Sequence, residues 1–124
     1  MLGSRQLGFF GRKTTLPAPH YDSGLQTVTF DSRLELPHGF GVTPSLFHVT
    51  LVCSTINQNY AVGDEVSPGW SGANTSNAGL VTFANATNVV IVTGNGIDIL
   101  DHDTAFSTAA LTAASWRYRA RAWR

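Results

Sequence analysis

The chain has 124 residues, of which 43% are apolar and 13% are charged, and its formal net charge is zero. This length suits one domain with its own hydrophobic core, and the sequence lacks the run of about 18 apolar residues that a membrane-spanning helix needs. Charged residues usually make up about 25% of a globular domain. Two interpretations of the low value stay open: a partner or another copy covers much of the surface, or the surface is that of an ordinary β domain rich in Ser, Thr and Asn.

The charges are separated along the chain. Residues 1–21 carry three bases and no acid, residues 22–115 carry all eight acids and one base, and the last eight residues carry four arginines. Positive termini on a negative body favour head-to-tail contact between copies, or docking on an acidic partner. Because nucleic-acid-binding domains are usually basic throughout, we expect no specific nucleic-acid partner.

Residues 1–22 differ from the rest of the chain. Their apolar side chains follow neither a helical nor a strand period, and Gly and Pro interrupt them. We interpret this segment as an extended N-terminal arm that becomes ordered on a neighbour; at about 3.3–3.6 Å per residue it can span roughly 70–80 Å. The alternative is a disordered terminus. The start of the segment lacks a long apolar run, so we expect no secretory signal. The arm residues expected to bind a partner are Leu7, Phe9, Phe10, Arg12 and Lys13.

From residue 23 onward the pattern has a period of two, which is typical of β-strands. Apolar runs separated by Gly, Pro and Asn turns predict strands at 25–30, 33–36, 46–54, 79–84, 88–93, 97–100 and 116–124. The nearly continuous apolar run at 46–54 predicts a strand buried on both faces. Short strands of this number indicate an all-β sandwich over residues 23–124, either jelly-roll-like or Ig-like, since strand order cannot be read from strand count.

The last strand has the clearest pattern. Its residues alternate without a break between one face, with Trp116, Tyr118, Ala120 and Ala122, and the other, with Arg117, Arg119, Arg121 and Trp123. Arginines in one row repel one another unless carboxylates lie opposite them. The body of the chain or a neighbouring copy can supply these carboxylates, so we expect partner contacts through Arg117, Arg119 and Arg121.

The densest group of metal-ligating residue types is Asp98, Asp101, His102 and Asp103. It lacks the central Gly and the terminal Glu of a calcium loop, and ordinary turn chemistry explains it better. Cys53, the only cysteine, lies inside an apolar run and is expected to be a buried, inert thiol.

Other motifs are equally weak. His48 is interpreted as a core or interface histidine and His38 as a turn residue. No nucleophile elbow, phosphate-binding loop or paired-cysteine zinc signature is present in the sequence. We therefore expect a protein that is not an enzyme and has no cofactor, no metal and no catalytic residues.

Trp70 lies in a long polar loop at 68–77. Aromatic residues beside Asn and Ser are typical of both protein interfaces and sugar-binding surfaces. Packing under its own loop or a subunit interface is favoured over sugar binding, and Trp70 is taken as a further partner-binding residue.

Several motifs resemble a known group of proteins: Asp22-Ser23-Gly24, His38-Gly39-Phe40-Gly41, Leu51-Val52-Cys53, Tyr60-Ala61-Val62-Gly63-Asp64-Glu65-Val66, Asn85-Ala86-Thr87-Asn88-Val89 and Ser115-Trp116. Over residues 22–123 the pattern resembles small structural proteins of tailed-bacteriophage virions and, more distantly, the H-type lectin domain. The first resemblance implies a decoration, fibre or tail-associated protein, often trimeric. The second implies a sugar-binding trimer, but the arginine-rich last strand and the N-terminal arm are not features of that domain.

Together these features predict a capsid decoration, or cement, protein of a tailed bacteriophage, located in the virion on the capsid exterior or the tail. Its expected partners are further copies of itself, as a trimer, and the major capsid protein or another virion protein, with no membrane involved. The alternatives are a receptor-binding tail-fibre or head-fibre module that recognises a host glycan, and a tail or neck adaptor.

Overall fold

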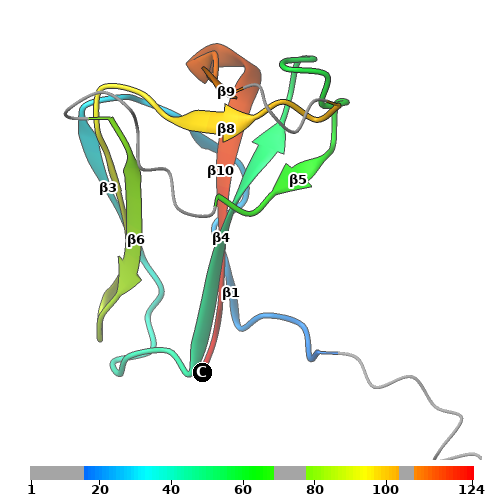
Figure 1. The fold of residues 1–124 in the computed structure, drawn as a ribbon. Helices are drawn as coiled ribbons and strands as arrows, with labels where there is room; N and C mark the ends of the chain where they lie inside the picture. The colour runs from blue at the N-terminus through cyan, green and yellow to red at the C-terminus, as the bar shows by residue number, and fades with distance from the viewer. Residues whose placement is uncertain (1–15, 69–77, 104–107) are drawn as a thin grey trace, which may run out of the picture.

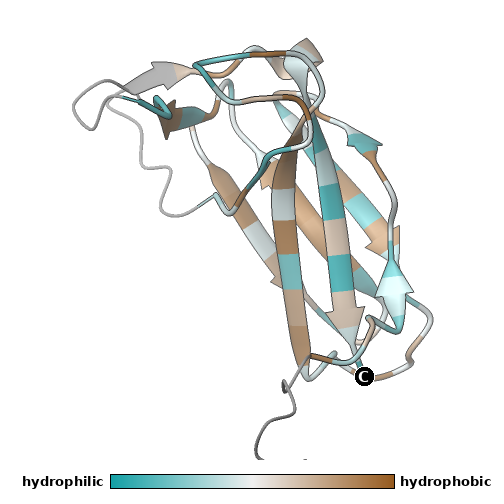
Figure 2. Cartoon of the chain, turned by 90° about the vertical axis from the view of Figure 1, so that its right-hand side faces the viewer, coloured by the Kyte–Doolittle hydropathy of each residue, from teal (hydrophilic) through white to brown (hydrophobic). Residues whose placement is uncertain are grey.

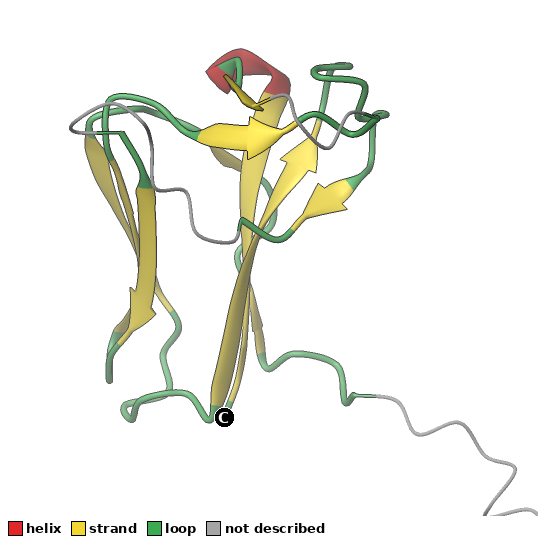
Figure 3. Ribbon diagram, viewed as in Figure 1, coloured by secondary structure: helices red, strands yellow, loops and turns green. Residues whose placement is uncertain are grey.

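The computed structural model describes residues 16–68, 78–103 and 108–124. These residues form ten β-strands and one turn of 3-10 helix, η1 (Ala113–Ser115), and contain no α-helix (Figure 3). The strands are β1 (Tyr21–Asp22), β2 (Gln26–Thr27), β3 (Ser32–Pro37), β4 (Leu46–Cys53), β5 (Glu65–Val66), β6 (Leu80–Ala84), β7 (Asn88–Thr93), β8 (Asp98–Leu100), β9 (Thr108–Ala110) and β10 (Trp116–Trp123). No helix in the described part is long and apolar enough to cross a membrane.

The strands form two antiparallel sheets that pack face to face as a β-sandwich, so the expected all-β sandwich is confirmed (Figure 1). In the larger sheet β10 pairs with β4 on one side and with β1 and β2 on the other, and β5 continues the sheet beyond β4. In the smaller sheet β7 lies between β3 and β6. The β8–β9 hairpin lies across one end of the sandwich, the upper end in Figure 1.

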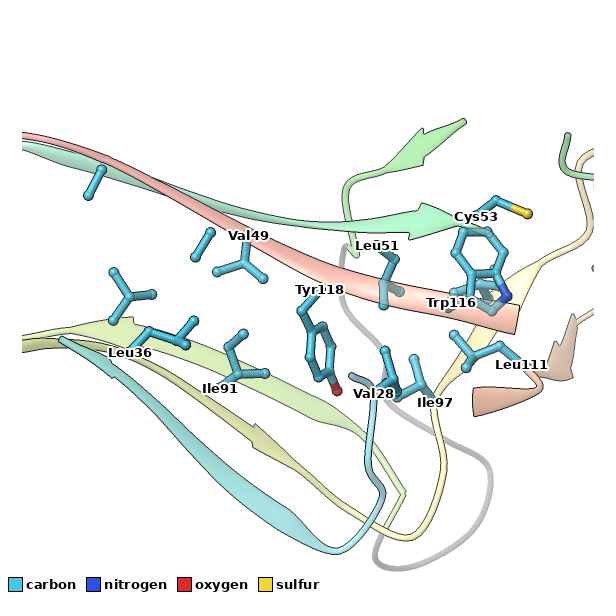
Figure 4. Packing of buried hydrophobic residues seen from close by; sticks show 14 residues of the cluster. Val28, Leu36, Val49, Leu51, Cys53, Ile91, Ile97, Leu111, Trp116 and Tyr118 are labelled. Carbon is cyan, nitrogen blue, oxygen red and sulfur yellow. The ribbon is translucent and has the colours of Figure 1, made fainter. Parts of the chain in front are cut away.

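The core lies between the two sheets (Figure 4). Strand β10 alternates between buried and half-buried residues along its whole length, as predicted for this segment, and Figure 2 shows the matching hydrophilic and hydrophobic bands on the long strands. The four inward residues of β10, Trp116, Tyr118, Ala120 and Ala122, are all buried in this core. Burying one large apolar side chain contributes about 1.5–3 kcal/mol, so this strand carries a large part of the packing energy.

One polar contact joins the two sheets inside the core. The hydroxyls of Tyr118 on β10 and Thr93 on β7 lie 2.6 Å apart, and both residues are buried. Burial raises the pKa of Tyr118 above its usual value, and the hydrogen bond with Thr93 opposes that shift. The contact satisfies two hydroxyls that would otherwise be costly to bury.

The expectation that the strand at 46–54 is buried on both faces is wrong. Only the face that carries Val49, Leu51 and Cys53 points into the core. Leu46 and His48 on the other face are exposed and Thr50 on that face is buried, and among the described residues no third layer covers the outer face of the larger sheet.

The predicted strand at 25–30 is shorter in the structure, where β2 ends at Thr27. After Thr27 the chain crosses to the smaller sheet: Val28 turns into the core, and Asp31 adopts a left-handed φ of 50° while its amide donates to the carbonyl of Gly94. Between the predicted strands at 97–100 and 116–124, the structure adds the short strand β9 and the 3-10 turn η1.

Candidate interaction surfaces

The outer face of β10 carries the arginine row, and the chain supplies a carboxylate for Arg119 itself. Arg119 donates from Nε to Oδ1 of Asp22 at 3.0 Å and from Nη2 to Oδ2 at 2.6 Å. The antiparallel pairing of β1 with β10 places Asp22 opposite Arg121. Arg119 lies two residues before Arg121 on the same face of β10, so Asp22 reaches it diagonally. These hydrogen bonds, with a further one from the amide of Gly24, hold the pKa of Asp22 down at about 2.

The carboxylate that pairs with Arg121 comes from β5, on the opposite side of β10 from β1. Arg121 donates from Nη1 to Oε1 of Glu65 at 3.0 Å and from Nη2 to Oε2 at 3.2 Å, while the hydroxyl of Thr50 donates to the same Oε1 at 2.8 Å. These hydrogen bonds lower the pKa of Glu65, with the bond from Arg121 as the largest cause. The ion pair therefore links β10 to β5 across β4.

The third arginine of the row pairs with backbone oxygens. Arg117 Nη1 donates to the carbonyls of Ala114 at 3.1 Å and Trp116 at 2.8 Å. Of the two sources of carboxylates that the sequence left open, the chain itself supplies those for Arg119 and Arg121. A partner that approached this face would meet ordered ion pairs, and contact through the three arginines stays a prediction.

The described histidines hold loops in place. His38 is buried, accepts a hydrogen bond at Nδ1 from the amide of Phe40, and has Nε2 2.8 Å from the carbonyl of Asn85. This pattern requires a neutral ring with its proton on Nε2, which ties the loop after β3 to the β6–β7 turn. Of the two interpretations of His48, the core histidine is wrong, because its ring lies on the exposed face, with Nε2 3.1 Å from Oγ of Ser67, and the interface histidine stays a prediction.

The group around Asp101 is held together by turn and side-chain hydrogen bonds. The amide group of Asn59 donates to both carboxylate oxygens of Asp101, at 2.9 and 3.1 Å, and the backbone amide of Asp103 donates to Oδ1. The His102 ring packs edge-on against Tyr60 and bonds to Asp103, which raises the pKa of His102. Among the residues with a described position, no three His, Cys, Asp or Glu side chains gather closely enough to hold a metal ion.

Cys53 is buried, as predicted. Its Sγ lies 3.1 Å from the carbonyl of Thr55 and 3.5 Å from that of Tyr60. The sulfur is shielded from solvent and lies against backbone carbonyls, so the environment suits an unreactive group.

Six of the predicted partner-binding residues lie outside the described residues: Leu7, Phe9, Phe10, Arg12, Lys13 and Trp70. The described chain begins at Leu16 and is tied to the body soon afterwards. Trp123 Nε1 donates to the carbonyl of Pro17 at 2.6 Å, and the amide of Arg124 donates to Nδ1 of His20 at 3.0 Å.

Sequence reasoning did not single out the acids that neutralise the arginine row. Alternation showed that Arg119 and Arg121 need carboxylates, but the choice of Asp22 and Glu65 depends on which short strands flank β10 and β4. Large apolar side chains that stand exposed on the surface were also missed: Leu16, Leu25, Val42, Leu46, Ile56, Val62, Val81 and Leu100.

Comparisons of the sequence with protein-family models and with curated proteins found no match. The resemblance to phage virion proteins and to the H-type lectin domain therefore stays a prediction.

Proposed function

We propose that this protein is a structural subunit of a tailed-bacteriophage virion, a decoration or cement protein that stabilises the capsid through contacts between copies and through its N-terminal segment. The observation that carries the proposal is the placement of exposed apolar side chains. Ile56, Val62 and Leu100 stand at the β8 end of the sandwich, and Leu16, Val42 and Leu46 stand at the end where β10 finishes (Figure 1). These exposed side chains give both ends of the sandwich apolar area that another protein can cover.

The charge distribution supports the same proposal. Three ion pairs within the chain pair charges on the outer faces of the two sheets: Asp22–Arg119, Glu65–Arg121 and Glu35–Arg33. A subunit that packs against others gains from paired charges on these faces, because fewer unpaired charges then lose water on assembly. Many identical weak contacts add up around a shell, so no single contact needs to be strong.

The experiment is reconstitution on capsids that lack the protein, imaged by electron cryomicroscopy. Full-length protein is expected to add density at symmetry-related positions on the shell. Deletion of residues 1–15 is expected to abolish that density while thermal unfolding of the domain stays unchanged. The deletion stops at residue 15 because Pro17, His20, Tyr21 and Asp22 bond to β10.

Two results would count against this role. A shell that stays bare with the full-length protein rejects the decoration function and makes the tail-fibre, head-fibre and adaptor alternatives the next to test. A folded deletion variant that still decorates the shell rejects the part given to the N-terminal segment.

A further inference from the structure

The acids of the chain divide into two groups by position. Asp22, Glu35 and Glu65 pair with arginines along the sheets. The other five are aspartates in the turns, loops and short strand at the upper end of the sandwich in Figure 1, called here the acidic end: Asp31, Asp64, Asp98, Asp101 and Asp103. Arg33 and Arg117 lie near the starts of strands at this end: Arg33 pairs with Glu35, and Arg117 donates to the carbonyls of Ala114 and Trp116.

Apolar side chains stand among these aspartates. Ile56, Val62 and Leu100 are all more than half exposed. Their loops are joined by hydrogen bonds, since the Tyr60 hydroxyl donates to the carbonyl of Leu100 and the His102 amide donates to that of Gln58. These bonds join the loop at 56–62 to the segment 100–102, so apolar side chains and aspartates stand side by side at the acidic end.

The opposite end has the complementary composition. Leu16, Val42 and Leu46 are exposed there, beside the C-terminal Arg124. The chain enters the body at this same end, where Pro17 bonds to Trp123. The preceding residues, 1–15, contain no acid and combine the bases Arg5, Arg12 and Lys13 with the apolar residues Leu2, Leu7, Phe9 and Phe10.

We propose that the acidic end of one copy binds residues 1–15 and the adjoining basic end of a second copy in a head-to-tail contact. Negative charge with apolar area on one end meets positive charge with apolar area on the other, which sets both partner and orientation. A contact between two different surfaces closes into a ring or continues as a chain, and a ring of three copies would use every such surface. This inference rests on the self-association part of the proposed function and does not need a capsid.

The first test is sedimentation velocity of the full-length protein at low and high salt. Association is expected to weaken by about tenfold or more at high salt, because screening acts on exposed charges. Val62→Lys is expected to weaken it by a similar factor, since it places a positive charge on the acidic end. Val81→Lys is the matched control: Val81 is 60% exposed and Val62 64%, but Val81 lies on the outer face of the smaller sheet and should leave association unchanged.

The second test mixes two full-length variants that each lose association alone. One carries Val62→Lys and keeps its N-terminal segment; the other carries Arg12→Glu with Lys13→Glu and keeps its acidic end. A head-to-tail contact predicts that the mixture forms a dimer of one copy of each, which cannot grow further. A segment that folds back on its own body predicts that mixing restores nothing.

Three results would overturn the head-to-tail contact: a wild-type chain that stays monomeric at low salt, equal effects of Val62→Lys and Val81→Lys, or no mixed dimer. The capsid experiment tests the decoration role independently of this association. A wild-type chain that associates head to tail but leaves the shell bare supports this inference and rejects the decoration role, whereas decoration by a monomer does the reverse.

Discussion

The guanidinium of Arg119 makes two hydrogen bonds to the carboxylate of Asp22, which lies 97 residues earlier in the chain. This ion pair fastens the start of the domain to its last strand. It also lowers the pKa of Asp22 from 3.8 to about 2.

The sign of the pH dependence follows from that shift. A carboxyl group with a pKa lowered by folding contributes stability above its unfolded pKa, and that contribution is lost as the pH falls from about 4 to about 2. Because both side chains are about one-third exposed, solvent screening reduces the contribution to about 1 kcal/mol or less.

Asp22→Asn is therefore expected to lower the free energy of unfolding at neutral pH by up to about 1 kcal/mol and to flatten its decline between pH 4 and 2. Urea unfolding at a series of pH values measures both effects. Glu35→Gln is the control, because Glu35 pairs with Arg33 on the same strand, both side chains are about half exposed, and the change should affect stability less. Equal losses for the two variants would contradict a fastening role for the Asp22–Arg119 pair.

Tyr118→Phe is expected to destabilise the fold by about 1–3 kcal/mol, since it leaves the hydroxyl of Thr93 buried without its partner. Adding Thr93→Val removes that unpaired group and should recover much of the loss. Thermal unfolding of the two single variants and the double variant gives the coupling. A double variant as unstable as the sum of the single variants would show that the two hydroxyls do not act as a pair.

Asn57→Ala is expected to cost about 1–3 kcal/mol of unfolding free energy. Its Oδ1 accepts hydrogen bonds from Nε1 of the fully buried Trp116 at 2.9 Å and from the amide of Thr112 at 3.2 Å. Tryptophan fluorescence during denaturation follows the change directly. Asn59→Ala, in the same loop but exposed, should cost less, and an equal cost would mean that the loss comes from the loop rather than from the indole contact.

Cys53 is expected to react with a thiol reagent only when the domain opens, because its sulfur is buried and faces two carbonyl oxygens. The rate of labelling should rise with denaturant in step with unfolding. Rapid labelling of the native protein, at the rate of a free thiol, would contradict the buried environment.

The strand pattern carried most of the information about the fold. The alternation at 116–124 predicted β10 and its two faces, and the runs at 79–84 and 88–93 correspond to β6 and β7. The alternating pattern succeeds at β10 because this strand has one buried and one outer face, whereas the apolar run at β7 matches a central strand with Val89, Val90 and Ile91 all buried. The prediction that the strand at 46–54 is buried on both faces failed because Leu46 and Val52 are apolar residues on its outer face. Apolar composition alone cannot tell which faces of a strand are covered.

Pairing over long distances could not be predicted. Strands β1, β2 and β5 have two residues each, too few to show a period, yet they bring Asp22 and Glu65 to the arginine row. The need for carboxylates followed from the charges of Arg119 and Arg121, whereas the identity of those acids followed only from strand order and register.

The pairing of Tyr21 with Ala122 gives the domain a mechanical direction. The first and last strands are antiparallel neighbours, so the residues before β1 and the residue after β10 leave the sheet at the same end of this strand pair. A force that pulls the two termini apart loads the hydrogen bonds between β1 and β10 one after another, beginning with the outermost, rather than all together. Under such a pull the hydrogen bonds of β1 would break one at a time. The two ends of the chain would therefore separate under a smaller force than if all these bonds had to break together.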